Sequence, residues 1–229
     1  MLRHFAVVMT GVLLSVALQA QEPAGAGQRE RFRPARVVSV TEVHNADPIL
    51  GVSSGIVVLE VKVDENGKME GVTARRDIEP LTPHVARWVQ EWTFAPARLN
   101  GKRIASIVTV AAAVSPSGLY GMGSALPAAK ESPDASEREA LFRPPQVLDA
   151  IYPGYPLTNL ISGAAAVEAT ISETGEVGDI KVLRDVAPLT SAATSAIKGW
   201  KFQAATLRGK PVAAKVVLAL VYRSPTHIP

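Results

Sequence analysis

The residues that could do chemistry in this sequence are few and widely separated. Cysteine is absent, which excludes disulfides, thiolate metal sites and a cysteine nucleophile. His44, His84 and His227 show no metal-ligand spacing. Asp77 and Asp185 are related by the repetition described below, but each comes shortly before a proline, where aspartate commonly makes a turn. We therefore expect no enzyme: no catalytic residues, no metal ligands and no cofactor.

Composition and charge restrict the function further. The chain has 229 residues, of which 47% are hydrophobic, enough to build one or two packed domains. Disorder along the whole chain is excluded, because disordered chains are poor in apolar residues and strongly charged. Lys and Arg number 24 against 21 Asp and Glu, a small surplus with no concentrated basic stretch. Nucleic acid is therefore not an expected partner.

The N-terminus is typical of an export signal. Arg3 and His4 precede an apolar run at 5–18, and polar residues follow Ala20. We interpret residues 1–20 as a signal peptide cleaved after Ala20, which predicts a periplasmic protein. The alternative is an uncleaved inner-membrane anchor, in which case the protein would contact the membrane. The apolar run is about 14 residues, shorter than the roughly 20 that span a bilayer.

Two segments of the chain resemble one another in an ungapped register. Equivalent positions share Gly, Asp, Trp, Phe and Ala residues, together with the tripeptide Pro-Leu-Thr and a Gly-Lys pair. In the first segment these are Gly55, Gly67, Asp77, Pro80-Leu81-Thr82, Trp92, Phe94, Ala97 and Gly101-Lys102; in the second they are Gly163, Gly175, Asp185, Pro188-Leu189-Thr190, Trp200, Phe202, Ala205 and Gly209-Lys210. Internal similarity of this kind predicts two homologous domains, at 32–114 and 141–224. The intervening 115–140 is rich in Ser, Pro and Gly and is predicted to be a flexible linker.

The elements expected within each copy follow from hydrophobic periodicity. An alternating strand is followed by a hairpin turn at Gly67 or Gly175 and by a second strand. A helix with apolar residues on one face then begins, with Thr82 as the expected N-cap. A last strand closes each copy, at 104–114 and 212–222. The predicted fold class is α+β: two repeated β-β-α-β modules, each a small antiparallel sheet with a helix packed on one face.

The two last strands are apolar on both faces. In 212–222 one face carries Val and Leu, and the other carries Ala213, Val217, Ala219 and Val221 with Lys215 as the single charge. A strand of this kind requires cover on both sides, and the helix supplies one. The second face is expected to meet the sister domain or a second chain. The alternative is that small Ala and Val side chains are partly exposed, as scattered apolar residues often are.

The order of these motifs resembles the TonB C-terminal domain. The second copy carries the resemblance through Tyr152-Pro153, Gly163, Glu173-Thr174-Gly175, Trp200-Lys201-Phe202, Ala205 and Gly209-Lys210-Pro211-Val212. The first copy is similar through Gly55, Asn66-Gly67, Trp92-Thr93-Phe94-Ala95-Pro96-Ala97 and Asn100-Gly101-Lys102, but it has His44-Asn45 in place of Tyr152-Pro153. The chain also departs from an energy-transducing TonB protein, which has a long proline-rich arm between its membrane helix and this domain. Here the segment between Leu18 and Phe32 would reach at most about 45 Å.

The resemblance implies pairing with extended peptides of outer-membrane transporters by strand addition, in which an open sheet edge accepts a partner strand. The implied edge is the last strand of the second copy, with Tyr152 and Pro153 near the path of the peptide. The expected binding residues are Tyr152, Pro153, Lys215, Val217, Ala219 and Val221.

We therefore expect a non-catalytic periplasmic adaptor that binds envelope proteins. One alternative is a membrane-anchored component of TonB-type transport. The other is a structural homo-oligomer, either a homodimer or a larger assembly.

Overall fold

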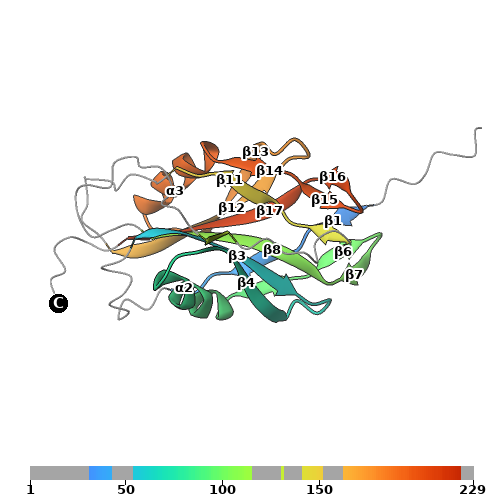
Figure 1. The fold of residues 1–229 in the computed structure, drawn as a ribbon, viewed down its shortest axis with the longest axis horizontal. Coiled ribbons are helices and arrows are strands. Elements are labelled where there is room, and N and C mark those ends of the chain that lie inside the picture. Colours follow the sequence, from blue (N-terminus) through green and yellow to red (C-terminus); the bar gives the residue numbers. More distant parts are fainter. Residues whose placement is uncertain (1–30, 43–53, 115–129, 132–140, 152–161, 223–229) are drawn as a thin grey trace, which may run out of the picture.

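The computed structural model describes residues 31–42, 54–114, 130–131, 141–151 and 162–222. Within these ranges the protein is α+β, with two helices and many strands (Figure 1). The predicted signal at 1–20 lies outside the described residues, as do Tyr152 and Pro153. Within the described ranges, neither helix is long and apolar enough to cross a membrane.

Both halves have the same element order. The first half contains β1 (Phe32–Arg33), β2 (Arg36–Ser39), β3 (Gly55–Val63), β4 (Met69–Asp77), α2 (Leu81–Gln90), β5 (Thr93–Ala95), β6 (Ala97–Leu99), β7 (Lys102–Ile104) and β8 (Ser106–Val114). The second contains β10 (Phe142–Arg143), β11 (Gln146–Asp149), β12 (Gly163–Ile171), β13 (Val177–Arg184), α3 (Leu189–Lys198), β14 (Lys201–Gln203), β15 (Ala205–Leu207), β16 (Lys210–Val212) and β17 (Ala214–Tyr222).

The long strands of both halves form one sheet, in the order β13-β12-β17-β8-β3-β4-β9. The neighbours in this sheet are antiparallel except at its centre, where β17 and β8 run parallel. The prediction of a separate small antiparallel sheet in each module is therefore wrong, since the two halves share a mixed sheet. Their last strands pair with each other.

The register of this central pairing places the two helices on opposite faces of the sheet (Figure 1). Val217 is equivalent in the repetition to Thr109, but it lies opposite Val110. A shift of one residue between equivalent strands exchanges the two faces. As a result α2 covers one face and α3 covers the other. The face of each half that its own helix leaves uncovered therefore lies on the same side of the sheet as the helix of the other half.

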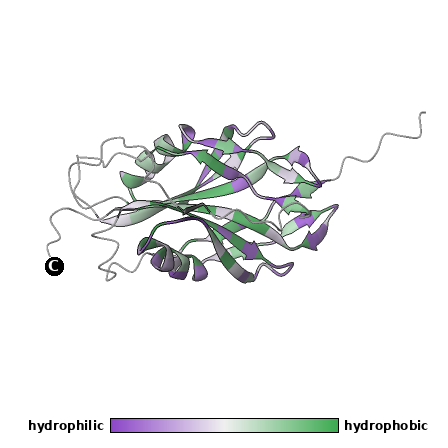
Figure 2. Cartoon of the chain, in the orientation of Figure 1, coloured by the Kyte–Doolittle hydropathy of each residue, from purple (hydrophilic) through white to green (hydrophobic). Residues whose placement is uncertain are grey.

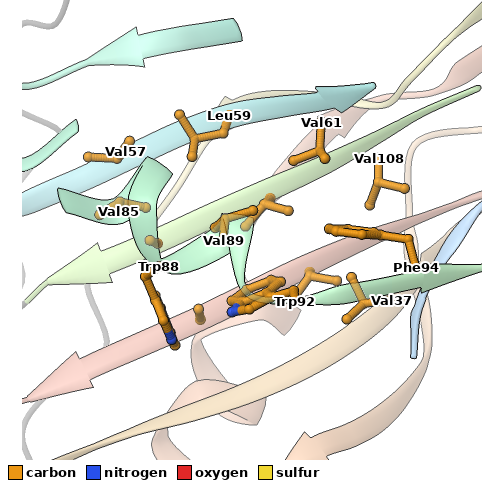
Figure 3. Close-up of a cluster of buried hydrophobic side chains, with 14 of the residues drawn as sticks. Val37, Val57, Leu59, Val61, Val85, Trp88, Val89, Trp92, Phe94 and Val108 are labelled. Atoms are coloured by element: carbon orange, nitrogen blue, oxygen red, sulfur yellow. The ribbon is translucent and has the colours of Figure 1, made fainter. Parts of the chain in front are cut away.

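Among the described residues, two large hydrophobic cores and a smaller cluster around Phe142 result, and both large cores contain residues from both halves. The core under α2 joins Leu59 and Trp92 of the first half with Val217 and Ala219 of the second. The core under α3 contains Ala111 from the first half. Figure 3 shows the α2 side of the first core, where the helix residues Val85 and Val89 face Val57 and Leu59 of β3. Hydrophobic residues accordingly gather on the long central strands, and hydrophilic ones lie at turns and on outward helix faces (Figure 2).

The predicted hairpin turns are confirmed. Gly67 and Gly175 have φ of +89° and +86°, which L side chains rarely adopt. A Cβ on either glycine would also lie within 2.5 Å or 2.2 Å of the carbonyl oxygen of Phe94 or Phe202. Glycine is therefore required twice over at each turn.

The helix start differs from the prediction by two positions, since the N-cap is Pro80 and not Thr82. The helices begin at Leu81 and Leu189, so Thr82 is the second helical residue and not the N-cap. Its hydroxyl oxygen accepts a hydrogen bond from the backbone N–H of Ile78 at 2.9 Å. Thr190 accepts one from Val186 at 2.8 Å in the same way. Each threonine thus secures the turn that leads into its helix.

The segment predicted to be a linker contributes one element. Lys130 and Glu131 form β9, which adds antiparallel to the outer edge of β4, opposite Asp77 and Arg76. The rest of 115–140 lies outside the described residues.

Candidate functional site

The strand predicted to bind peptides is not an open edge in this structure. β17 pairs with β12 on one side and with β8 on the other, through Val216–Val221 opposite Thr109–Val114. We call this parallel β17–β8 pairing the seam. The edge that the resemblance implies therefore already holds a parallel strand, which comes from the first half of the same chain.

The predicted binding side chains on β17 are buried by this arrangement. Val217 and Ala219 have no exposed surface, and Val221 is 4% exposed. All three pack in the core under α2, beside Leu59 and Trp92. This confirms the expectation that the second face of the strand meets the sister domain.

Lys215 is the one charged residue among those predicted on β17. Its Nζ lies 3.6 Å from Glu168 Oε1 and donates to Thr170 Oγ1 at 2.6 Å. Glu168 is 3% exposed, so the ammonium group compensates a buried carboxylate. In the first half the equivalent Glu60 is also buried, and it pairs with Arg75 at 2.8 Å. Lys215 therefore has a structural partner inside the protein.

Three further contacts hold the two halves together beyond the seam. The Thr109 hydroxyl donates to the Pro145 carbonyl at 2.8 Å, and this bond is buried. The rings of Phe32 and Phe142 lie 5.0 Å apart between centroids.

The third contact is an ion pair between Arg184 at the end of β13 and Glu42, at 2.9 Å. Of these three contacts, the sequence signals one, because Phe32 and Phe142 begin the recurring Phe-Arg-Pro at 32–34 and 142–144.

The residue before Tyr152 is anchored in the second half. Trp200 donates its indole N–H to the Ile151 carbonyl at 3.0 Å, at the end of α3. The first half makes the same kind of bond from Trp88 to the Thr41 carbonyl at 3.1 Å. Tyr152 and Pro153 themselves lie outside the described residues, so their place relative to β17 stays a prediction.

The sheet ends at β13 on one side, and on the other side β4 is followed only by the two-residue strand β9. Beyond the two residues of β9, no strand pairs with the outer side of β4 or β13 within the described ranges. Both outer strands carry irregularities in register against their inner neighbour, a common feature of sheet edges. These are the positions where a further strand could join without displacing one.

The titratable groups of the described residues form no metal site, since no group of three or more His, Asp or Glu side chains comes together there. Among the described residues, Asp64 has a shifted pKa. The backbone N–H of Lys68 donates to Asp64 Oδ1 at 2.7 Å and lowers the pKa of Asp64, and the N–H of Asn66 adds to this effect. Asp64 lies in the exposed β3–β4 turn, where it organises the backbone.

Part of the second half is similar to a known protein family. Residues 150–223, about a third of the chain, match the family model of the Gram-negative bacterial TonB protein C-terminal. A search of the curated proteins finds no similar sequence. The matched segment includes β12, β13, α3 and β17, so it contains the second-half side of the seam.

Proposed function

We propose that this chain is a tandem pair of TonB C-terminal domains acting as a non-catalytic periplasmic adaptor, because residues 150–223 match the model of that family, which takes part in TonB-type transport and protein interaction. The first half would be the other domain of this pair. Its element order and its Gly67 turn match those of the other half, which supports this assignment.

The adaptor would bind extended segments of envelope proteins, such as outer-membrane transporters, by strand addition to β17. One observation carries this proposal: the outer side of β17 accepts a parallel strand along Val216–Val221. Strand addition supplies main-chain hydrogen bonds, and alternate side chains set specificity. In this protein β8 occupies the position, so an external segment would bind only after the seam separates.

A disulfide across the seam tests this requirement. Ala112 and Ala219 lie directly opposite each other in register, and both are buried in the core under α2. Adjacent strands are about 4.8 Å apart, within the range a disulfide spans. The chain contains no cysteine, so the double variant Ala112→Cys/Ala219→Cys can form a single intramolecular disulfide.

We expect the reduced double variant to bind fluorescent peptides from the periplasmic ends of the host's outer-membrane transporters, and the oxidised variant to bind none of them. The single variant Ala112→Cys, treated with the same oxidant, is the control. Equal binding by the oxidised and reduced forms would contradict strand addition at β17. Such a result would place binding elsewhere on the protein.

The periplasmic location is part of this proposal and has its own test. Intact mass of the native protein from soluble and membrane fractions should give a soluble species that begins at Gln21. A membrane species that retains Met1 to Ala20 would instead support a membrane-anchored component of TonB-type transport.

A further inference from the structure

The outer strand β13 ends the sheet and carries charges that its counterpart lacks. Within the described residues it pairs with β12 alone. Asp179 and Lys181 are both exposed on β13, with Ile180 between them. The equivalent positions on β4 are Gly71 and Thr73, and β4 receives β9 from its own chain. The two ends of the sheet therefore differ: β4 is paired in part by β9, and β13 carries exposed charges of both signs.

We propose that β13 pairs antiparallel with β13 of a second copy of this chain, about a two-fold axis at Ile180. In this register Asp179 of each copy lies opposite Lys181 of the other, which gives two cross-strand pairs of opposite charge. Such pairs stabilise antiparallel strands, and like charges in the same place destabilise them. The exposed Val182 would lie opposite Gly178, which leaves room for the larger side chain.

The order of the charges selects this register. Two-fold pairing keeps each face of the strand opposite itself, so the register can shift only in steps that keep the faces aligned. The two nearest alternatives place Asp179 opposite Asp179, or Lys181 opposite Lys181. An edge strand that carried only lysines would not pair with a second copy, because the lysines would repel one another, as in many monomeric sheets. An acidic residue two positions before a basic one makes the edge complementary to itself.

The strength of the association is limited by the shape of β13. Its register against β12 is irregular between the partners of Ala169 and Ile171, and again beside Ala166. The regular register therefore covers only Ile180 to Val182, and Asp179 lies within the irregularity that precedes it, which leaves a short stretch for pairing. We therefore expect a weak dimer that forms at high protein concentration and dissociates as salt screens the exposed charges.

The test is sedimentation equilibrium of the full chain from about 10 µM to about 1 mM, a range suited to weak association. We expect a monomer–dimer equilibrium in the wild type. Asp179→Lys and Lys181→Asp should each raise the dissociation constant about tenfold, because each places like charges opposite one another twice. Lys181 lies opposite the buried Glu168 within its own sheet, so Asp179→Lys is the safer of the two for folding.

Two combinations separate the proposed pairing from a general effect of charge. An equimolar mixture of the two single variants should form a heterodimer, since each lysine then faces an aspartate. The double variant Asp179→Lys/Lys181→Asp should recover the wild-type dissociation constant. Glu70→Lys, which changes the charge of an exposed residue on β4, is the matched control and should leave the dimer unchanged. A monomeric wild type across the range, or a mixture that fails to associate, would overturn the proposal.

Discussion

Single polar residues organise the hairpin turns, and the two halves use different residues for the same task. Asp64 Oδ1 accepts backbone hydrogen bonds from Asn66 and Lys68 at 2.8 and 2.7 Å. At the equivalent turn Ser172 Oγ accepts from Thr174 and Glu176 at 3.2 and 3.0 Å. In each turn the more distant donor lies four positions after the acceptor, so a carboxylate in one half and a hydroxyl in the other close turns of the same length. They differ in their response to pH.

The first prediction follows from the charge of Asp64. Its pKa lies below the usual value of aspartate because the Lys68 N–H, followed by that of Asn66, stabilises the carboxylate. A carboxyl whose pKa is lower in the folded than in the unfolded state stabilises the fold above its unfolded pKa. That contribution is lost as the pH falls through the folded pKa. We expect Asp64→Ser to have a lower free energy of unfolding than the wild type at pH 7, and the two values to converge in acid.

Urea denaturation of both proteins between neutral pH and about pH 2 measures this difference, and a carboxyl carbon titration by NMR locates the pKa of Asp64. Ser172→Ala is the control, since its loss removes hydrogen bonds without a titrating group. A stability difference between Asp64→Ser and the wild type that is independent of pH would contradict the assignment.

At the scale of elements, the second prediction concerns the turns of the short hairpins β6–β7 and β15–β16. Both turns place two residues at positive φ: Asn100 and Gly101 at 51° and 86°, and Arg208 and Gly209 at 50° and 76°. Asn-Gly is the preferred pair for such a turn, and arginine is unfavourable there. Asn100 also uses its side-chain oxygen to accept from the Arg31 N–H at 2.9 Å.

We expect Arg208→Asn to stabilise the protein by about 0.5–1 kcal/mol, because it relieves a left-handed arginine. The new amide can also reach the strand start at Leu141, whose carbonyl already accepts from the Arg208 N–H. The reverse change, Asn100→Arg, should destabilise by at least as much. Thermal unfolding of the two variants checks both signs. A lower midpoint for Arg208→Asn would show that the arginine side chain contributes more than the turn strain costs.

The same scale explains what could be predicted from the sequence. Alternation along β3 and the glycines at 67 and 175 are local signals, so the first strands and turns follow from them. Trp92, Phe94, Trp200 and Phe202 recur at equivalent positions of both copies, and all four are buried although they lie just after the helices. The seam was not predicted, because no local pattern specifies which distant strand will pair with β17. The apolar character of both its faces predicted cover on both sides, and left open whether a sister domain or a second chain would provide it.

The closure of β17 by β8 could not be predicted for a related reason. The resemblance describes one domain at a time, and an edge that is open in a single domain can be closed by a second domain on the same chain. Lys215 was the available signal of closure. This single charge on an otherwise apolar face pairs with the buried Glu168 of the neighbouring strand.

At the scale of the whole molecule, shared cores predict that the two halves unfold together. Val217 belongs to the second half but is fully buried in the core under α2, beside Trp92 of the first half. Val217→Ala should therefore destabilise the whole chain by about 2 kcal/mol. Val182→Ala, on the same half but 45% exposed, is the matched control and should change stability by less than about 0.5 kcal/mol.

Tryptophan fluorescence can follow each half separately, because Trp88 and Trp92 lie in the core under α2 and Trp200 lies in the core under α3. With Trp200→Phe the signal reports the first half, and with Trp88→Phe/Trp92→Phe it reports the second. Coincident transitions, shifted together by Val217→Ala in both backgrounds, are expected of one cooperative unit. If Val217→Ala moved only the Trp200 transition, the halves would be independent domains. The seam would then be a weak contact that an external strand could displace at little cost.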